Sequence, residues 1–211
     1  AIRMLSSESS VDGTRLRLGQ NTEMEERRIV AATGRLSEAN IWFDDTPVLT
    51  AAELRAKSRR LSNEAGGLDL IIIDYLQLMQ GEGGGRNENR VQEISYISRT
   101  LKGLARELDV PIVALAQLSR AIENRNPRIP MLSDLRDSGS IEQDADIVMF
   151  LSREDMYVTP EQWAEQHPEL PASAYPKGVA QVHVAKNRNG PTGMVELRFR
   201  DRFAKFEDWV L

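Results

Sequence analysis

A short apolar run that ends in an aspartate constrains this chain of 211 residues more than any other feature. Residues 68–74 read Leu-Asp-Leu-Ile-Ile-Ile-Asp and are rich in β-branched side chains. Such a run is typical of a strand buried on both faces of a parallel sheet. Similar runs at 110–116 and 146–151 predict two more buried strands.

Helical segments alternate with these strands. Thr50 and Glu53 match a capping box, which predicts a helix that ends at about residue 65, before Gly66. Apolar residues recur at helical spacing between 91 and 108, which predicts an amphipathic helix. The alternation indicates an α/β fold, a mainly parallel sheet flanked by helices.

The remaining segments predict shorter elements. Residues 40–45 are typical of a short strand, and residues 81–85 are rich in glycine and predict a mobile loop. Alternating residues at 180–186 and 194–199 predict a hairpin, an antiparallel carboxy-terminal annex that extends one edge of the sheet. Residues 159–175 contain three prolines and are expected to form a surface insertion.

Composition narrows the class of protein. The absence of cysteine excludes disulfides, thiolate metal sites and cysteine nucleophiles. No apolar run is long enough to span a membrane, and the first residues do not match a signal peptide. A net charge of −5 argues against a dedicated binder of duplex DNA. This net charge does not exclude local basic loops, because electrostatic contact is local at physiological salt. We expect a single domain over residues 1–211.

Three groups of residues are candidates for chemistry at strand ends. Asp74 could hold Mg²⁺ through water, as in a Walker B motif, or merely hydrogen-bond a turn. Gln117 could contact a γ-phosphate or simply terminate its strand. Lys186 and Arg188 could reach a phosphate as an arginine finger does, or protect an edge strand by their charge.

A fourth group lies in the polar stretch after residue 119. Gly139 stands beside small hydroxyl residues, so backbone N–H groups there could approach a phosphate. Arg136 adds a fork of hydrogen-bond donors. The alternative is an ordinary helix N-terminus with Ser140 as its cap.

The order of these motifs is more specific than any one of them. The segments 73–79, 114–120, 134–146 and 186–191 closely resemble the successive motifs of the DnaB family of replicative helicases. The resemblance implies a RecA-like domain of a homo-hexameric ring that encircles single-stranded DNA and moves 5′ to 3′ using ATP and Mg²⁺. It also implies a cytoplasmic protein that meets a primase and a helicase loader.

The resemblance assigns a role to each nucleotide-site candidate. It implies that Asp74 is the Walker B ligand of Mg²⁺, through water, and that Gln117 senses the γ-phosphate and links it to the DNA loops. Lys186 and Arg188 resemble the pair that reaches the ATP of the neighbouring subunit.

The resemblance also places Arg136, Asp137 and Gly139 in a loop that holds the DNA backbone. The family usually has glutamate where this chain has Asp137, which shortens the carboxylate by one methylene. The glycine-rich loop after Met79 resembles the other channel loop but matches it poorly residue by residue.

The larger departure is an absence. The chain has no G-x-x-x-x-G-K-[ST] phosphate loop, which in the family lies just before the segment that resembles residues 1–12. We therefore expect the first strand and the phosphate loop to be missing, and these residues alone to be inactive. The alternatives are a non-catalytic module that keeps only interface and DNA-contacting surfaces, or another RecA-like ATPase such as a recombinase or a clock ATPase.

Overall fold

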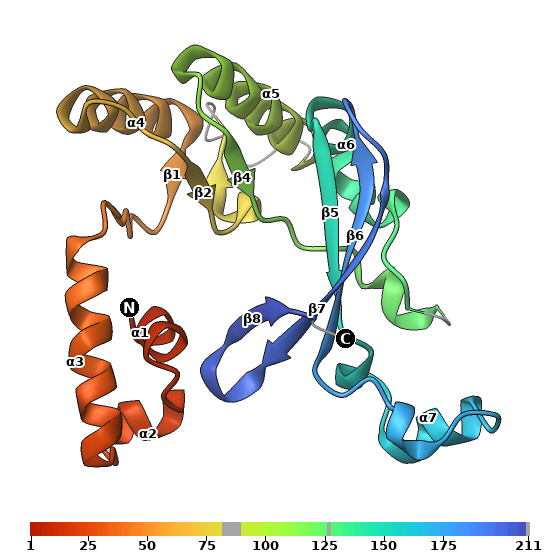
Figure 1. Cartoon of the computed structure of the whole chain (residues 1–211). Coiled ribbons are helices and arrows are strands. Elements are labelled where there is room, and N and C mark those ends of the chain that lie inside the picture. Colours follow the sequence, from red (N-terminus) through yellow and green to blue (C-terminus); the bar gives the residue numbers. More distant parts are fainter. Residues whose placement is uncertain (82–89, 126–127, 210–211) are drawn as a thin grey trace. The chain divides into compact units, whose positions relative to one another are not determined.

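The structure is a computed structural model that describes residues 1–81, 90–125 and 128–209, without the side chains of residues 136–138 (Figure 1). Its contacts divide the chain into two compact units, which we describe separately. The central unit comprises Asp44–Phe150 and Val184–Gly193, and the terminal unit comprises Ala1–Phe43, Leu151–His183 and Met194–Leu211. A single domain over 1–211 stays a prediction.

The first helix of the central unit has the ends that its sequence predicts. Strand β1 (Leu49–Thr50) leads into α4 (Ala51–Ala65). Thr50 Oγ1 accepts a hydrogen bond from the Glu53 N–H at 3.2 Å, and the Glu53 carboxylate accepts one from the Thr50 N–H at 2.9 Å. Gly66 follows α4 in the left-handed conformation, with φ 77°, where glycine has no Cβ penalty.

The loop before β1 is tied to α4 by an ion pair. Lys57 Nζ lies 2.7 Å from Asp44 Oδ2, and Thr46 donates two hydrogen bonds to Asp44 Oδ1. Hydrogen bonds from Lys57, and then from Thr46, lower the pKa of Asp44 to about 2. The carboxylate is therefore stabilised in its charged form.

Short parallel strands confirm the predicted sheet type. β2 (Ile71–Ile73) pairs with β4 (Ile112–Ala114), and Ile73 lies opposite Ala114. β1 pairs in the same sense with β3 (Met79–Gln80). The carboxyl ends of β2 and β4 therefore meet at one edge of their sheet.

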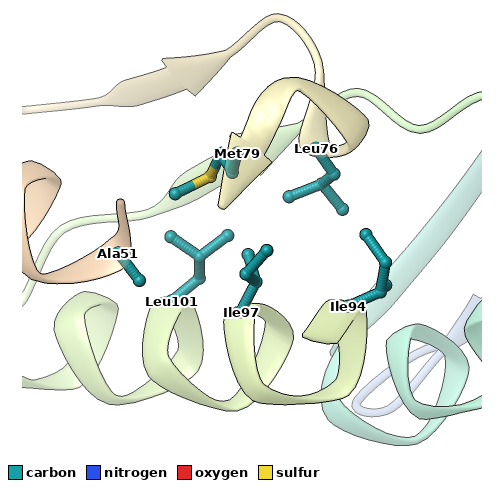
Figure 2. Close-up of a cluster of buried hydrophobic side chains, with 6 residues drawn as sticks. All are labelled: Ala51, Leu76, Met79, Ile94, Ile97 and Leu101. Carbon is teal, nitrogen blue, oxygen red and sulfur yellow. The ribbon is translucent and has the colours of Figure 1, made fainter. Parts of the chain in front are cut away.

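The helix α5 (Arg90–Leu108) and the one-turn η1 (Leu76–Leu78) enclose the main core of the central unit. Its buried side chains, drawn in Figure 2, are Ala51, Leu76, Met79, Ile94, Ile97 and Leu101. Burial of each large aliphatic side chain stabilises the fold by roughly 1.5–3 kcal/mol. The core therefore fixes the segment that follows Asp74 against α5.

The prediction that the strands are buried on both faces is wrong. Ile72 and Val113 lie opposite each other in β2 and β4 and are 63% and 42% exposed. Ile73, on the other face, packs against the core of α5. Among the residues that the structure describes in the central unit, no element covers the face of Ile72 and Val113.

The prediction of a strand at 40–45 is also wrong. Residues 40–46 have no regular secondary structure, and Trp42 and Phe43 are 51% and 73% exposed. A strand needs a neighbour that pairs its backbone N–H and C=O groups. No described strand provides such a neighbour for this segment.

Beyond β4 the chain forms short helices around a second core. They are η2 (Arg120–Asn124), η3 (Leu132–Ser138) and α6 (Gly139–Asp144). The second cluster contains Leu135, Val148 and Phe150, with Ala116, Leu118, Leu132, Ala145 and Ala185 packed against it. Several residues of this cluster, such as Ala116 and Ala185, lie directly before predicted site residues in the sequence, Gln117 and Lys186.

An antiparallel sheet confirms the predicted annex, but it is separate from the parallel pairs and does not extend their edge. It includes residues 147–152, where the prediction of a strand buried on both faces is wrong, because Ile147, Met149 and Leu151 are 52%, 57% and 54% exposed. Its strands are β5 (Ile147–Ser152), β6 (Val179–Asn187), β7 (Gly193–Arg200) and β8 (Lys205–Asp208), in that order. β7 and β8 are antiparallel, with Phe199 opposite Phe206, and their rings lie 4.8 Å apart between centroids. The one-turn η6 (Asp201–Phe203) connects these two strands.

The terminal unit opens with three helices, α1 (Ile2–Ser9), α2 (Gly13–Leu18) and α3 (Glu23–Glu38). Asp12 caps α2, because its carboxylate accepts hydrogen bonds from the N–H groups of Thr14 and Arg15 in the first turn of that helix. Thr22 begins a second capping box at α3. No described helix of the chain is both long and apolar enough to cross a membrane.

The segment expected to be a surface insertion has an aromatic centre. It contains α7 (Pro160–Gln166) and η5 (Ala172–Ala174), and the one-turn η4 (Glu154–Met156) precedes it. The buried ring of Trp163 stacks on His167 at 4.6 Å and meets the edge of Tyr175 at 6.1 Å, both between centroids. These rings order a segment that the sequence presents as proline-rich and polar.

Candidate nucleotide and DNA site

Asp74 and Gln117 follow neighbouring strands at the same edge of a sheet. Asp74 comes directly after β2, and Gln117 follows β4 within three residues. The parallel register therefore brings both side chains to the carboxyl edge, where ligands of open α/β sheets bind. Both residues are exposed there, and the Asp74–Tyr75 peptide bond is cis.

A third residue, Gln77, connects the two strand ends. Its side-chain Nε2 donates to the Gln117 carbonyl at 3.4 Å, and its Oε1 accepts from the Gln117 N–H at 3.3 Å. Gln77 lies within the motif at residues 73–79, but its sequence position alone indicates no role for it. The only signal in the sequence is an amide side chain three residues after Asp74. The partner of this amide, Gln117, becomes apparent only from the register of the strands.

Lys186 and Arg188 lie against the carboxyl end of α6. Lys186 Nζ donates to the carbonyl of Glu142 at 2.5 Å, and Arg188 Nη2 donates to that of Gln143 at 3.1 Å. Cations are favoured at such an end because its last carbonyls lack helical partners. The Arg188 side chain keeps 45% of its surface exposed. The two basic residues therefore share one site on this chain.

Asp146 completes this basic cluster. Arg188 Nη1 lies 3.2 Å from Asp146 Oδ1, and Lys102 Nζ donates to the other carboxylate oxygen. The hydrogen bond from Lys102 lowers the pKa of Asp146, and the charges of Lys102 and Arg188 act in the same direction. No local pattern in the sequence indicates the pair of Asp146 and Lys102, because their contact joins α5 to the start of β5.

The second hydrophobic cluster lies beneath four of these positions. Ala116, Ala145 and Ala185 pack against it, and Leu135 is one of its buried members. Each precedes in the chain, by one residue, a position discussed above: Gln117, Asp146, Lys186 and Arg136. One packed cluster thus anchors strands and helices that carry distant parts of the sequence.

The predicted DNA loop is only partly within the described residues. The side chains of Arg136 and Asp137 lie outside them, as does most of the glycine-rich stretch, over residues 82–89. Gly139 is exposed at the start of α6, and a Cβ there would meet no atom within 4 Å. Neither packing nor a positive φ requires glycine at this position, so the open space is compatible with close approach of a ligand.

Comparison with known proteins decides the family. The profile of the family described as "DnaB-like helicase C terminal domain" matches residues 1–208. The chain belongs to this family. It is 47% identical over 205 residues to the Replicative DNA helicase DnaB of Geobacillus stearothermophilus, and covers 42% of that protein. The Replicative DNA helicase DnaC of Bacillus subtilis (strain 168) gives the same identity and coverage.

Solved structures agree with this DnaB-like assignment. The structure titled "The Structure Of A DnaB-Like Replicative Helicase And Its Interactions With Primase" superposes with a TM-score of 0.86 and 34% identity, over 99% of this chain and 47% of the other. A second solved structure, described as an ATPase domain, gives a TM-score of 0.86 and 35% identity, over 99% of this chain and 69% of the other. The RecA-like α/β fold is therefore confirmed.

The candidate site has a carboxylate that suits Mg²⁺. Asp74 is exposed and has no ion-pair partner within the described ranges. Those ranges also contain no cluster of three or more acidic or histidine side chains that would enclose a metal by itself. Mg²⁺ commonly binds one or two carboxylates, several waters and substrate phosphates. A single aspartate at a strand end can provide one of these carboxylates.

Proposed function

We propose that this chain is the ATP-hydrolysing part of a replicative DNA helicase that acts as a homo-hexamer on single-stranded DNA. The observation that carries the proposal is the carboxyl edge of β2 and β4, where Asp74 and Gln117 follow strands that pair in register. The replicative DNA helicases to which the chain is 47% identical support it. The chain spans about 42% of the length of these relatives.

Each candidate residue has a role in this proposal. Asp74 would bind Mg²⁺ through water, and the ion would neutralise charge on the β- and γ-phosphates of ATP. Gln117 would hydrogen-bond the γ-phosphate and respond to its loss. Lys186 and Arg188 would leave the end of α6 and stabilise the transition state on the ATP of a neighbouring protomer.

DNA would be held by its phosphates. Arg136 would donate to a phosphate, and Gly139 would let the backbone approach it. Asp137 would orient that loop. Phosphate-led contact tolerates any sequence, which suits a protein that moves 5′ to 3′ along one strand. We further propose a primase and a helicase loader as partners, and a cytoplasmic location.

The test is Arg188→Ala in the protein expressed with whatever sequence flanks residues 1–211 in its gene. ATP binding should be retained, while DNA-stimulated hydrolysis should fall by about 10³ or more, as for other arginine fingers. Arg200→Ala is a matched control, because Arg200 is 42% exposed and also pairs with a carboxylate, that of Glu207. Near-normal turnover by Arg188→Ala would remove the finger role.

A second measurement tests the contact with DNA. The affinity of the assembled protein for single-stranded DNA should fall steeply with salt, because bound phosphates release counterions. A salt-independent affinity would contradict phosphate-led binding. Strand exchange without unwinding of a forked substrate would favour the recombinase alternative.

A further inference from the structure

One carboxylate is shared by the proposed finger, Arg188, and a second cation, Lys102. Asp146 Oδ2 accepts a hydrogen bond from Lys102, and Asp146 Oδ1 forms an ion pair with Arg188. The backbone of Arg188 is held as well, because its N–H donates to the Asp146 carbonyl at 2.8 Å. The main chain of Arg188 is thus anchored to residue 146, while its side chain can turn.

The two cations differ in how firmly they are placed. The Lys102 side chain is 22% exposed and extends from the middle of the long helix α5. The Arg188 side chain is 45% exposed and follows the end of β6. Ion pairs of exposed side chains are weak, so little free energy is lost when one of them opens. Lys102 is therefore the lasting partner of Asp146, and Arg188 the partner that can leave.

We infer that Asp146 is a positioning residue that retains Arg188 against α6 until a nucleotide in the neighbouring protomer attracts it. Lys102 keeps the carboxylate in place and neutralised when the arginine departs. This inference rests on the proposed function, since it assigns a resting position to the finger. Neither Asp146 nor Lys102 touches the nucleotide in this arrangement.

The resting position lies on the same short helix as the DNA loop. α6 begins at Gly139 and ends at Asp144, a rise of about 9 Å at roughly 1.5 Å per residue. Its last carbonyls accept hydrogen bonds from Lys186 and Arg188. Any displacement of the loop at the start of α6 therefore moves the acceptors of both cations, so DNA contact would loosen the finger.

The experiment compares steady-state ATP hydrolysis with and without single-stranded DNA, in the full-length protein. Asp146→Asn should raise the unstimulated rate by about two- to fivefold, the factor that one exposed ion pair contributes to an equilibrium. The stimulated maximum should change less, so the stimulation ratio falls. Lys102→Met should lower the unstimulated rate, because Asp146 then binds Arg188 alone, and Lys102→Arg should restore it.

Glu107→Gln is the matched control. Glu107 also lies on α5 and is also shared by two cations, Arg55 and Arg59, which belong to α4. Its substitution should leave the stimulation ratio unchanged. A merely structural role of Asp146 would lower both rates together, and that result, or an unchanged ratio, would overturn the inference.

A double-mutant cycle separates this inference from the proposed function. Asp146→Asn and Arg188→Gln, singly and together, should show coupling in urea unfolding, whatever the enzyme does. No coupling overturns the inference. An unchanged ratio in Asp146→Asn, while Arg188→Ala abolishes hydrolysis, overturns it and leaves the proposed function standing. A parent protein without DNA-stimulated hydrolysis overturns the proposed function, and the inference with it.

Discussion

Replacement of Ile97 by alanine is the sharpest test of the core beneath the segment that follows Asp74. Ile97 is 0% exposed on α5 and packs among Leu76, Met79 and Leu101 (Figure 2). The substitution removes most of the side chain at a point enclosed by other elements. Two of the neighbours that would have to fill the space, Leu76 and Met79, belong to the short segment that follows Asp74.

The expected cost follows from that enclosure. Ile→Ala at buried sites costs about 2–5 kcal/mol, and the value rises with the cavity that remains. Since Ile97 is 0% exposed, we expect a cost in the middle of this range, about 3–4 kcal/mol. Ile97→Val, which removes one methyl group, should cost about 0.5–1.5 kcal/mol.

The assay is urea unfolding followed by far-ultraviolet circular dichroism, because the mutated residue lies in a helix. Val30→Ala is the control, since Val30 is 73% exposed on α3, and it should change stability by less than about 0.5 kcal/mol. If Ile97→Ala cost no more than this control, the packing described for α5 would be refuted.

Other predictions concern charge, backbone and caps. The lowered pKa of Asp44 stabilises the fold fully above pH 3.8, the unfolded value, and this stability is lost as the pH falls to about 2. Asp44→Asn should therefore flatten the dependence of the unfolding free energy on pH over that window. Because the side chain is 41% exposed, solvent screening limits the effect to about 1 kcal/mol or less. Gly178 and Gly66 both have positive φ, but only at Gly178 would a Cβ meet a backbone oxygen, that of Phe199, at 3.1 Å; Gly178→Ala should therefore lower the melting temperature more than Gly66→Ala. Thr50→Ala should cost about 1 kcal/mol in the same melts, and a cost near zero would remove the capping box as a source of stability.

Local signals predicted the helices best. The ends of α4 follow from Thr50, Glu53 and Gly66, which act on neighbours within a few residues. The apolar stripe of residues 91–108 predicted α5 for the same reason. The three helices of residues 2–38 were not predicted, although Thr22 and Glu25 form a capping box as plain as that of α4.

Features that depend on distant partners were not predictable. The segment 40–45 has the composition of a strand but no strand to pair with among the described residues, and a sequence does not state that. The burial of β2 and β4 on both faces was wrong because residue type indicates what a side chain prefers, and not what covers it. The site divides in the same way: motifs identified Asp74 and Gln117, whereas only the fold revealed the contacts of Gln77 and Asp146.

The bridge made by Gln77 has a mechanical consequence. Gln77 binds the main-chain N–H and C=O of Gln117 and leaves the amide side chain of Gln117 unused by this bridge. The main chain of Gln117 can therefore stay in place while its side chain changes rotamer. In the proposed role of Gln117, contact with a γ-phosphate would therefore need no rearrangement of the sheet. A shortened side chain at position 117 would lose that contact and keep the hydrogen bonds to Gln77.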